Sequence, residues 1–307
     1  MADVIRRADL EAQEVSYPDY ILDKVLPFWD KQQIAGNYYY QLFKDDVAAQ
    51  YDRDHADLDE ITSNTMKANS DTFACKELRS RIKMAYTQFR GYGSEDGGWS
   101  AMGRMAKRAW YNSAEVKVAK AILDVDAPAP VGSNLVSALE KGVTALRDMG
   151  VGRIGMVLSN HNLVALKGDA TIKERMVYTG VIERGLEPRY IAPNQIASMV
   201  GCDEIVVGKD DLWYAGLDAA DRNNVALVIL PEANIDPAEE CQFGRTIYFQ
   251  WADSEADKFV MESWHDAEVD AEVVDAKGLI DIKIMNPRFV KVFNIADDSS
   301  DSESESL

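Results

Sequence analysis

The sequence has few of the residues that build covalent or metal-bound frameworks. Its 307 residues include only three cysteines, Cys75, Cys202 and Cys241, and three histidines. The cysteines are far apart, and none has the C-x-x-C spacing or the adjacent histidine that zinc sites use. An odd, scattered set also argues against a disulfide framework. We therefore expect three reduced, partly buried thiols and no structural zinc site.

Long apolar runs are missing as well. No run approaches the roughly 18 residues that a membrane-spanning helix needs. The first ten residues, Met-Ala-Asp-Val-Ile-Arg-Arg-Ala-Asp-Leu, carry acidic side chains where a secretory signal would be apolar. We expect a protein that is made in the cytoplasm and has no membrane partner.

Positive charge is scarce, with 33 Lys and Arg against 52 Asp and Glu and a net charge of −19. Proteins that grip nucleic acid through its phosphates normally carry a basic excess or a basic block. The densest basic stretches here, residues 76–83 and 104–108, are short and flanked by apolar residues. We interpret them as solvated faces or subunit contacts, and we predict no sequence-specific binding of nucleic acid.

The first part of the chain reads as a series of extended pieces. Residues 1 to about 18 are polar and mildly helical without an apolar face, which predicts a segment that needs a partner surface. Residues 20–29 form an apolar anchor. Strand-favouring runs at 38–43 and 79–86 lie on either side of the acidic run 52–60, which predicts a projecting β-loop.

Four glycines, Gly91, Gly93, Gly97 and Gly98, predict a hinge after this loop. The best helix follows over residues 100–123, because apolar residues recur there at steps of three and four. These residues are Met102, Met105, Ala106, Ala109, Trp110, Val116, Ala119 and Leu123.

Proline in 124–130 ends this helix. A second helix is predicted from an N-cap at Ser133, with Leu135, Leu139, Val143 and Leu146 on one face.

The second half alternates short apolar strands with short helices. We predict strands at 154–159, 204–208, 226–231 and 243–251, and helical pieces at 172–180 and 193–200. Residues 280–284 and 290–292 alternate apolar and polar side chains around Asn286-Pro287, which predicts a half-buried β-hairpin. Residues 296–307 form an acidic low-complexity tail that we expect to be disordered.

One motif suggests a nucleotide site. Gly150-Val-Gly-Arg-Ile-Gly155 matches G-x-G-x-x-G, but in a dinucleotide fold these glycines follow a strand and open a helix. Here a helix ends at Met149 and a strand begins at Ile154, so we interpret the motif as a helix C-cap and a turn. The sequence has no G-x-x-x-x-G-K-[ST] loop.

The three histidines give no convergent chemistry. His55 with Asp57 and Asp59 would share one face of a strand, yet this acidic segment is a poor frame for a metal site. His161 follows Ser159, but no G-x-S-x-G elbow surrounds the serine. His265 has no evident partner. We predict no enzyme activity, no catalytic residues, no cofactor and no metal.

Four stretches, taken in order, carry a resemblance. They are 23–27, an anchor after an N-terminal arm; 156–166, a strand and then a helix ending in leucine; 196–208, a helix, a glycine turn and an apolar strand; and 225–231 with 243–251, a closing pair of strands. Together with the preceding loop and long helix, they resemble the major capsid proteins of tailed bacteriophages. The resemblance implies an α+β chain with the Hong Kong 97-like fold.

The resemblance also implies a division of the chain. Residues 1–35 would be the N-terminal arm and 36–97 the extended β-loop region. Residues 98–150 and 266–295 would form the peripheral domain around its spine helix, 151–265 the axial domain, and 296–307 the acidic tail. Some members of the family are cross-linked between Lys and Asn, but nothing assigns Lys67 and Asn69 to that role.

The implied function is self-assembly into pentamers and hexamers of an icosahedral phage head around double-stranded DNA, in the virion. The implied partners are other copies, a separate scaffolding protein, a portal, a decoration protein and DNA held without sequence specificity. Two alternatives stay open: an encapsulin-type nanocompartment shell, and an α/β nucleotide-binding enzyme that uses the loop at Gly150.

Overall fold

The computed structural model describes most of the chain. The described residues are 5–12, 21–42, 69–92, 94–131, 134–149, 152–178, 191–209, 216–219, 221–232, 235–251 and 258–295. The acidic run 52–60, Lys67 and the tail 296–307 lie outside them. The described strands form three sheets, here called the long sheet, the short sheet and the β3–β4 hairpin.

The long sheet has six strands in the order β1-β11-β12-β10-β2, and β5 also pairs with β12. Their bounds are β1 (Ile5–Arg6), β2 (Phe28–Lys31), β5 (Lys76–Ala85), β10 (Gly244–Phe249), β11 (Val260–Asp266) and β12 (Ala271–Ile284). β12 is 14 residues long. Its first part pairs antiparallel with both β5 and β11, and its last part pairs with β10.

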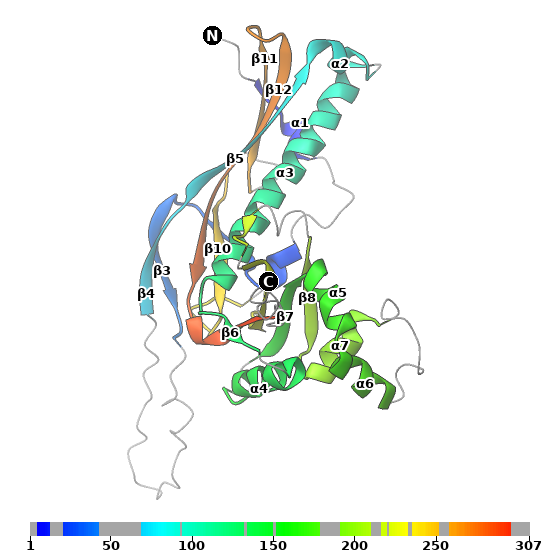
Figure 1. Ribbon diagram of the computed structural model, residues 1–307. Helices are drawn as coiled ribbons and strands as arrows, with labels where there is room; N and C mark the ends of the chain where they lie inside the picture. Colours follow the sequence, from blue (N-terminus) through cyan, green and yellow to red (C-terminus); the bar gives the residue numbers. More distant parts are fainter. Residues whose placement is uncertain are drawn as a thin grey trace, which may run out of the picture.

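Helix α3 (Glu95–Leu123) runs along one face of the long sheet, with α2 (Tyr86–Arg90) beside its start (Figure 1). The side chains of Met102, Ala106 and Trp110 on this helix are fully buried, as the apolar pattern predicted. Met105 was placed on the same stripe, and that placement is wrong, because it is 49% exposed.

The predicted glycine hinge is also wrong at the two positions that fall inside α3. Ser94 is the N-cap, and its Oγ accepts a hydrogen bond from the amide of Gly97 at 3.1 Å. Gly98 lies in the first turn, where a Cβ would sit 2.5 Å from Cε2 of Phe89. This glycine lets α2 pack against the helix instead of loosening the chain.

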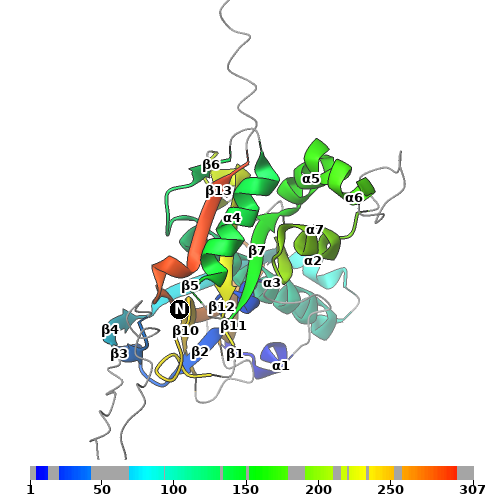
Figure 2. The same cartoon turned by 90° about the horizontal axis from the view of Figure 1, so that it is seen from below.

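The short sheet has five strands in the order β6-β13-β9-β7-β8. They are β6 (Ala129–Pro130), β7 (Arg153–Ser159), β8 (Glu204–Gly208), β9 (Asn224–Leu230) and β13 (Val290–Asn294). Helix α4 (Leu135–Arg147) lies against β7, β9 and β13 (Figure 2). Three shorter helices complete this part: α5 (Asn160–Gly168), α6 (Ala170–Tyr178) and α7 (Pro193–Val200).

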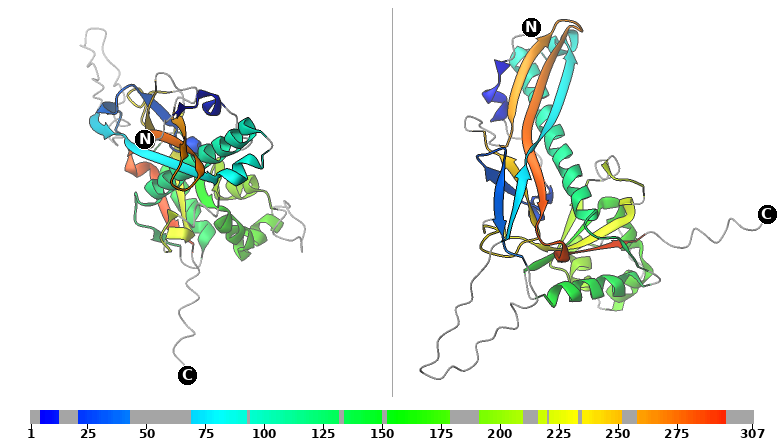
Figure 3. Two further views of the ribbon diagram at one scale, coloured as in Figure 1. Left: turned by 90° about the horizontal axis from the view of Figure 1, so that it is seen from above. Right: turned by 90° about the vertical axis from the view of Figure 1, so that its left-hand side faces the viewer.

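The remaining described elements are small. They are the hairpin of β3 (Ala35–Tyr40) and β4 (Asn69–Ala74), helix α1 (Ala8–Glu11), and the 3₁₀ turns η1 (Ile21–Lys24), η4 (Asp221–Asn223) and η5 (Pro287–Phe289). The molecule is elongated: the long sheet with α3 forms an extended part, and the short sheet with its helices forms the other end (Figure 3). We call these the shaft and the body.

The α+β fold class is confirmed, but two predicted pairings are wrong. Residues 280–284 and 290–292 do not form a hairpin, because β12 belongs to the long sheet and β13 to the short sheet. The strands at 226–231 and 243–251 likewise lie in different sheets, as β9 and β10. Alternation of side chains shows that a strand is half-buried, but it does not identify the strand's partner.

Candidate assembly surfaces

The residues singled out for chemistry that the structure describes do not come together. Gly150 lies outside the described residues. Gly152, with φ of +66°, comes directly before β7, so the glycine loop leads from a helix into a strand. This is the reverse of the order in a dinucleotide site, as predicted.

Ser159 and His161 do not form a nucleophile and base. Ser159 is fully buried, and its Oγ accepts a hydrogen bond from the amide of Asn162 at 3.0 Å, which makes it the N-cap of α5. His161 is exposed on the first turn of the same helix. His55 lies outside the described residues.

The prediction that His265 has no partner is wrong. Its Nδ1 lies 3.0 Å from Oε1 of Glu272 across the β11–β12 pair, and its ring meets Tyr86 edge-on. Within the described residues, no three His, Cys, Asp or Glu side chains gather closely enough to hold a metal ion. None of the described helices is both long enough and apolar enough to cross a membrane.

All three thiols are free, as predicted. Cys75 and Cys202 are buried, and burial raises the pKa of each thiol to about 11. Burial also raises the pKa of the half-buried Cys241. None of these thiols is held as a reactive thiolate.

The β3–β4 hairpin has a small core of its own on the long sheet. Tyr38, Phe73 and Cys75 pack there against Ile247 and Met285. Trp29 meets the ring of Tyr38 edge-on, and the Tyr38 hydroxyl donates to Asp71 Oδ2 at 3.1 Å. Burial raises the pKa of Tyr38, so this hydroxyl stays a donor. The hairpin is therefore fixed to the face of the sheet opposite α3.

A polar clamp holds the chain where it leaves β3. The amide of Gln41 donates to Pro237 O at 2.8 Å, and its side chain donates to Ala238 O at 2.8 Å. The carbonyl of Gln41 accepts from Asn286 Nδ2 at 3.0 Å. Three elements distant in sequence thus meet at one residue, which sets the direction of the chain at the start of the predicted β-loop.

The loop that receives Gln41 is itself held by a buried arginine. Arg245 is 2% exposed, and its guanidinium donates to Gln242 Oε1 and to the carbonyls of Glu232 and Ile235, each at 2.8 Å. Desolvation lowers the pKa of Arg245, but these acceptors satisfy its buried donors. The clamp therefore rests on an ordered loop.

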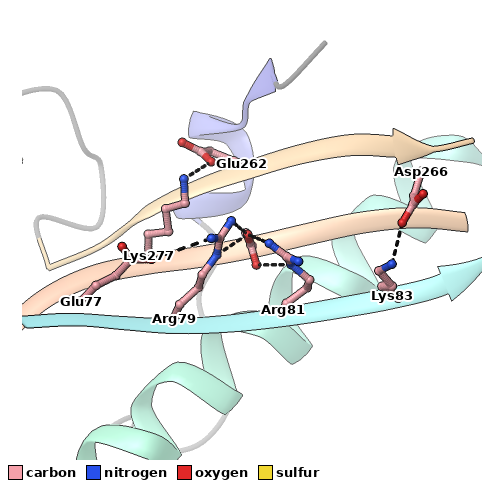
Figure 4. Close-up of polar contacts among 8 residues, drawn as sticks. Glu77, Arg79, Arg81, Lys83, Glu262, Asp266 and Lys277 are labelled. Atoms are coloured by element: carbon pink, nitrogen blue, oxygen red, sulfur yellow. Dashed lines mark hydrogen bonds and ion pairs between the residues drawn. The ribbon is translucent and has the colours of Figure 1, made fainter. Parts of the chain in front are cut away.

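The face of the shaft opposite α3 is charged (Figure 4). Arg79 Nε lies 2.6 Å and Arg81 Nη2 3.1 Å from Asp275 Oδ2 on the neighbouring strand β12. The Asp275 side chain is fully buried beneath the two guanidinium groups, which are 38% and 43% exposed. The hydrogen bond to Asp275 raises the pKa of Arg81.

Two more ion pairs flank this cluster. Lys83 Nζ lies 2.5 Å from Asp266 Oδ2, and Lys277 Nζ lies 2.5 Å from Glu262 Oε2 (Figure 4). Arg81 also stacks on the ring of Trp264 at 5.0 Å. The basic stretch 76–83 is therefore a cross-strand ion-pair network on a solvated sheet face, in agreement with the first of its two sequence interpretations.

The junction between shaft and body contains a cavity of about 520 Å³. Two cations from different elements, Lys24 at the end of η1 and Arg153 at the start of β7, pair with Glu204 on its wall. Glu240 and Cys241 also line this cavity. At the far end of the body, Val164 and Tyr178 are 59% and 93% exposed on α5 and α6. Neither of these two places brings together a set of reacting groups among the described residues.

No protein-family model matches this chain, and no curated protein matches it in sequence. Solved structures do match it in fold. A phage-related protein from Bordetella bronchiseptica superposes with a TM-score of 0.66 at 16% identity, covering 95% of this chain and 97% of that one. The capsid of cyanophage P-SCSP1u gives 0.55 at 11% identity, covering 92% and 91%. The chain has the Hong Kong 97-like fold of phage capsid proteins.

An encapsulin from Synechococcus elongatus has the same fold, with a TM-score of 0.51 at 8% identity, covering 92% of this chain and 90% of that one. The long helix expected at 100–123 is α3.

Several residues that organise these surfaces were missed in the sequence. Asp275 gave no signal, because its partners are about 195 residues away. Arg245 was predicted only as part of a strand, because arginine is fully buried only when it is paired and the sequence pattern does not show its partners. Glu11 and Gln41 act through contacts with distant backbone, which periodicity does not show.

Proposed function

We propose that this protein is a major capsid protein that assembles with copies of itself into a closed shell. The observation that carries the proposal is the fit of nearly the whole chain, 95%, to a phage-related structure, with capsid and encapsulin structures sharing the fold. Fold alone does not fix function. The proposal therefore also draws on surfaces built for packing and not for chemistry.

In this proposal the shell is an icosahedral phage head of pentamers and hexamers around double-stranded DNA. The copies are made in the host cytoplasm and end in the virion. A separate scaffolding protein, a portal and a decoration protein would complete the particle. The net charge of −19 supports DNA that is held without sequence specificity, because an acidic wall repels phosphate.

The peripheral and axial domains of the proposal correspond to the shaft and the body. The ranges expected from the sequence, 98–150 with 266–295 and 151–265, need an adjustment that follows the strand pairing. β10 and β11 pair within the long sheet and would be peripheral, whereas β13 pairs within the short sheet and would be axial.

The proposal is tested by electron microscopy of the expressed protein, alone and with the candidate scaffolding protein encoded beside it. We expect closed shells or isolated rings of five and six subunits. A strictly monomeric species of 34.2 kDa under all of these conditions would count decisively against a shell. A strongly positive inner surface in a shell would contradict the role of the acidic charge.

The encapsulin fold match supports a nanocompartment shell as the second candidate. The two candidates differ in content, since a phage head encloses DNA and a compartment encloses protein. Nuclease-resistant DNA in particles from infected or induced cells favours the phage head, and a co-purifying enzyme favours the compartment. A nucleotide bound to the purified monomer would instead support the α/β enzyme.

A further inference from the structure

The N-terminal segment, residues 5–12, docks on its own subunit. It lies against β11 and α3, and Leu10 and Glu11 are each 1% exposed. The sequence predicted that this segment needs a partner surface. In the described chain, the segment's own shaft supplies that surface.

Most contacts of residues 5–12 with the rest of the chain lie along one edge of β11. Arg6 pairs with Glu262 and Ile5 with Ser263 in the β1–β11 ladder. The amide of Arg7 donates to Met261 O at 2.9 Å, and the amide of Met261 donates to Glu11 Oε1 at 2.8 Å. A side-chain carboxylate therefore takes the place of a strand carbonyl.

The same segment has two contacts on α3. Leu10 packs in a notch at Gly103, where a Cβ would lie 3.2 Å from the Leu10 side chain. The Arg7 guanidinium lies 5.1 Å from the ring centre of Trp99, one turn earlier on the helix. Few anchors hold the segment, and each involves a residue of β11 or α3.

Without this segment, β11 would be the edge of the long sheet, since it pairs with β12 on its other side. Met261 would then present its amide and carbonyl without the partners that the segment provides. Open, apolar sheet edges are templates for pairing with another chain. A two-residue strand followed by a capping carboxylate is a compact way to close such an edge.

The edge of β11 is complementary to itself. In an antiparallel pair of two β11 strands centred on Ser263, Glu262 faces Trp264 and Met261 faces His265 of the second copy. Val260 faces Asp266 in this register, so no two like charges lie opposite each other. A pairing of this kind is isologous and closes as a dimer.

We propose that residues 5–12 guard the edge of β11 against pairing with a second copy of this chain. The segment holds the subunit in a form that cannot join through this edge, which leaves the other surfaces free for their own contacts. This role does not depend on shell formation, because it concerns the unassembled subunit.

The test compares the full chain with a chain lacking residues 2–12, below the concentration at which the full chain assembles. Sedimentation velocity should show the full chain at the 34.2 kDa of one subunit, and the deletion variant as a dimer at twice its own, smaller monomer mass. Hydrogen exchange should show the amide of Met261 protected in the full chain. In the deletion variant, this protection should return only as concentration rises and copies pair. A folded, monomeric deletion variant with a freely exchanging Met261 amide overturns the proposal.

A second variant keeps the test decisive if the deletion prevents folding. The full-length double variant Leu10→Asp, Glu11→Gln releases the segment without removing it, and it should dimerise about tenfold more strongly than wild type, a shift of about 1.4 kcal/mol. Ala8→Gln is the matched control, because Ala8 lies in the same segment with an exposed side chain, and it should stay monomeric. Equal association of the double variant and this control would also overturn the proposal.

Discussion

Gly278 on β12 lies directly beneath the indole of Trp110 on α3. A Cβ at position 278 would sit 2.5 Å from Cζ2 of that ring, and the indole Nε1 donates to Leu78 O on β5 at 3.0 Å. One tryptophan thus joins the spine helix to two strands. The glycine sets how closely the helix approaches the sheet.

Replacing Trp110 with Ala should lower the free energy of unfolding by about 3–5 kcal/mol, since the ring is fully buried and its removal leaves a cavity. Urea unfolding followed by circular dichroism measures the change. Met105→Ala on the exposed side of the same helix is the control, with an expected change within about 0.5 kcal/mol. Equal effects for the two variants would contradict the packing described.

Gly278→Ala should cost about 1–3 kcal/mol, because the added methyl group has no space beneath the indole. Combined with Trp110→Ala, which removes the clash with the indole, the same substitution should cost less, although the Lys258 carbonyl oxygen would still lie 2.8 Å from the methyl group. A double-mutant cycle measures this coupling. Simple additivity of the two changes would show that the glycine and the ring do not contact each other.

Arg79 and Arg81 should show coupled effects through Asp275. Each single change to Ala leaves the other guanidinium on the carboxylate, so each should cost about 0.5–1.5 kcal/mol. Together they leave a buried carboxylate without its cations, and the loss should exceed their sum, reaching about 3–5 kcal/mol. Adding Asp275→Asn to the double variant should restore part of that stability, and no recovery would refute the coupling.

Cys202 should make stability fall at alkaline pH. Its folded pKa is about 11, above the ordinary value of 9.0, because burial favours the neutral thiol. The stabilisation is complete below pH 9 and is lost between pH 9 and 11, as the unfolded thiol ionises first. This loss is measured by comparing the unfolding free energies of wild type and Cys202→Ala at pH 8, 9.5 and 11. The difference between the two proteins should change with pH only above 9.

Gln41 should matter for assembly more than for folding. Gln41→Ala removes one side-chain hydrogen bond and should cost about 0.5–1.5 kcal/mol of stability. If the clamp directs the β-loop towards a neighbouring copy, the variant should also form fewer closed shells in electron micrographs. Ser137→Ala on α4, away from the hairpin, is the control. If Gln41→Ala forms as many closed shells as wild type, the clamp has no role in assembly.

The sequence predicted most elements correctly because their signals are local. The helix at 193–200 and the strand at 204–208 were bounded by Pro193 and Gly201, whose effects reach only a few residues. The stripe around Trp110 predicted the spine helix, since burial repeats with the helix period.

The remaining features depend on contacts between distant residues. Alternation at 280–284 gave a strand but not the choice between β10 and β13 as its partner, because both candidates are apolar. The glycines at 97 and 98 suggested flexibility, and only the position of Phe89 shows that Gly98 serves packing. The basic stretch at 76–83 predicted a charged, solvated face, but not its partners on β11 and β12.

The length of β12 has a mechanical consequence. Its hydrogen bonds to β5 run side by side from Ala271 to Ile280, and the same strand continues into its pairing with β10. A pull along the molecule loads these bonds in shear, all at once, whereas a hairpin opened from its end breaks them one at a time. The shaft should therefore resist a stretching force along its length better than a force that peels β5 away from β12. Internal pressure on a closed shell would apply a stretching force of this kind.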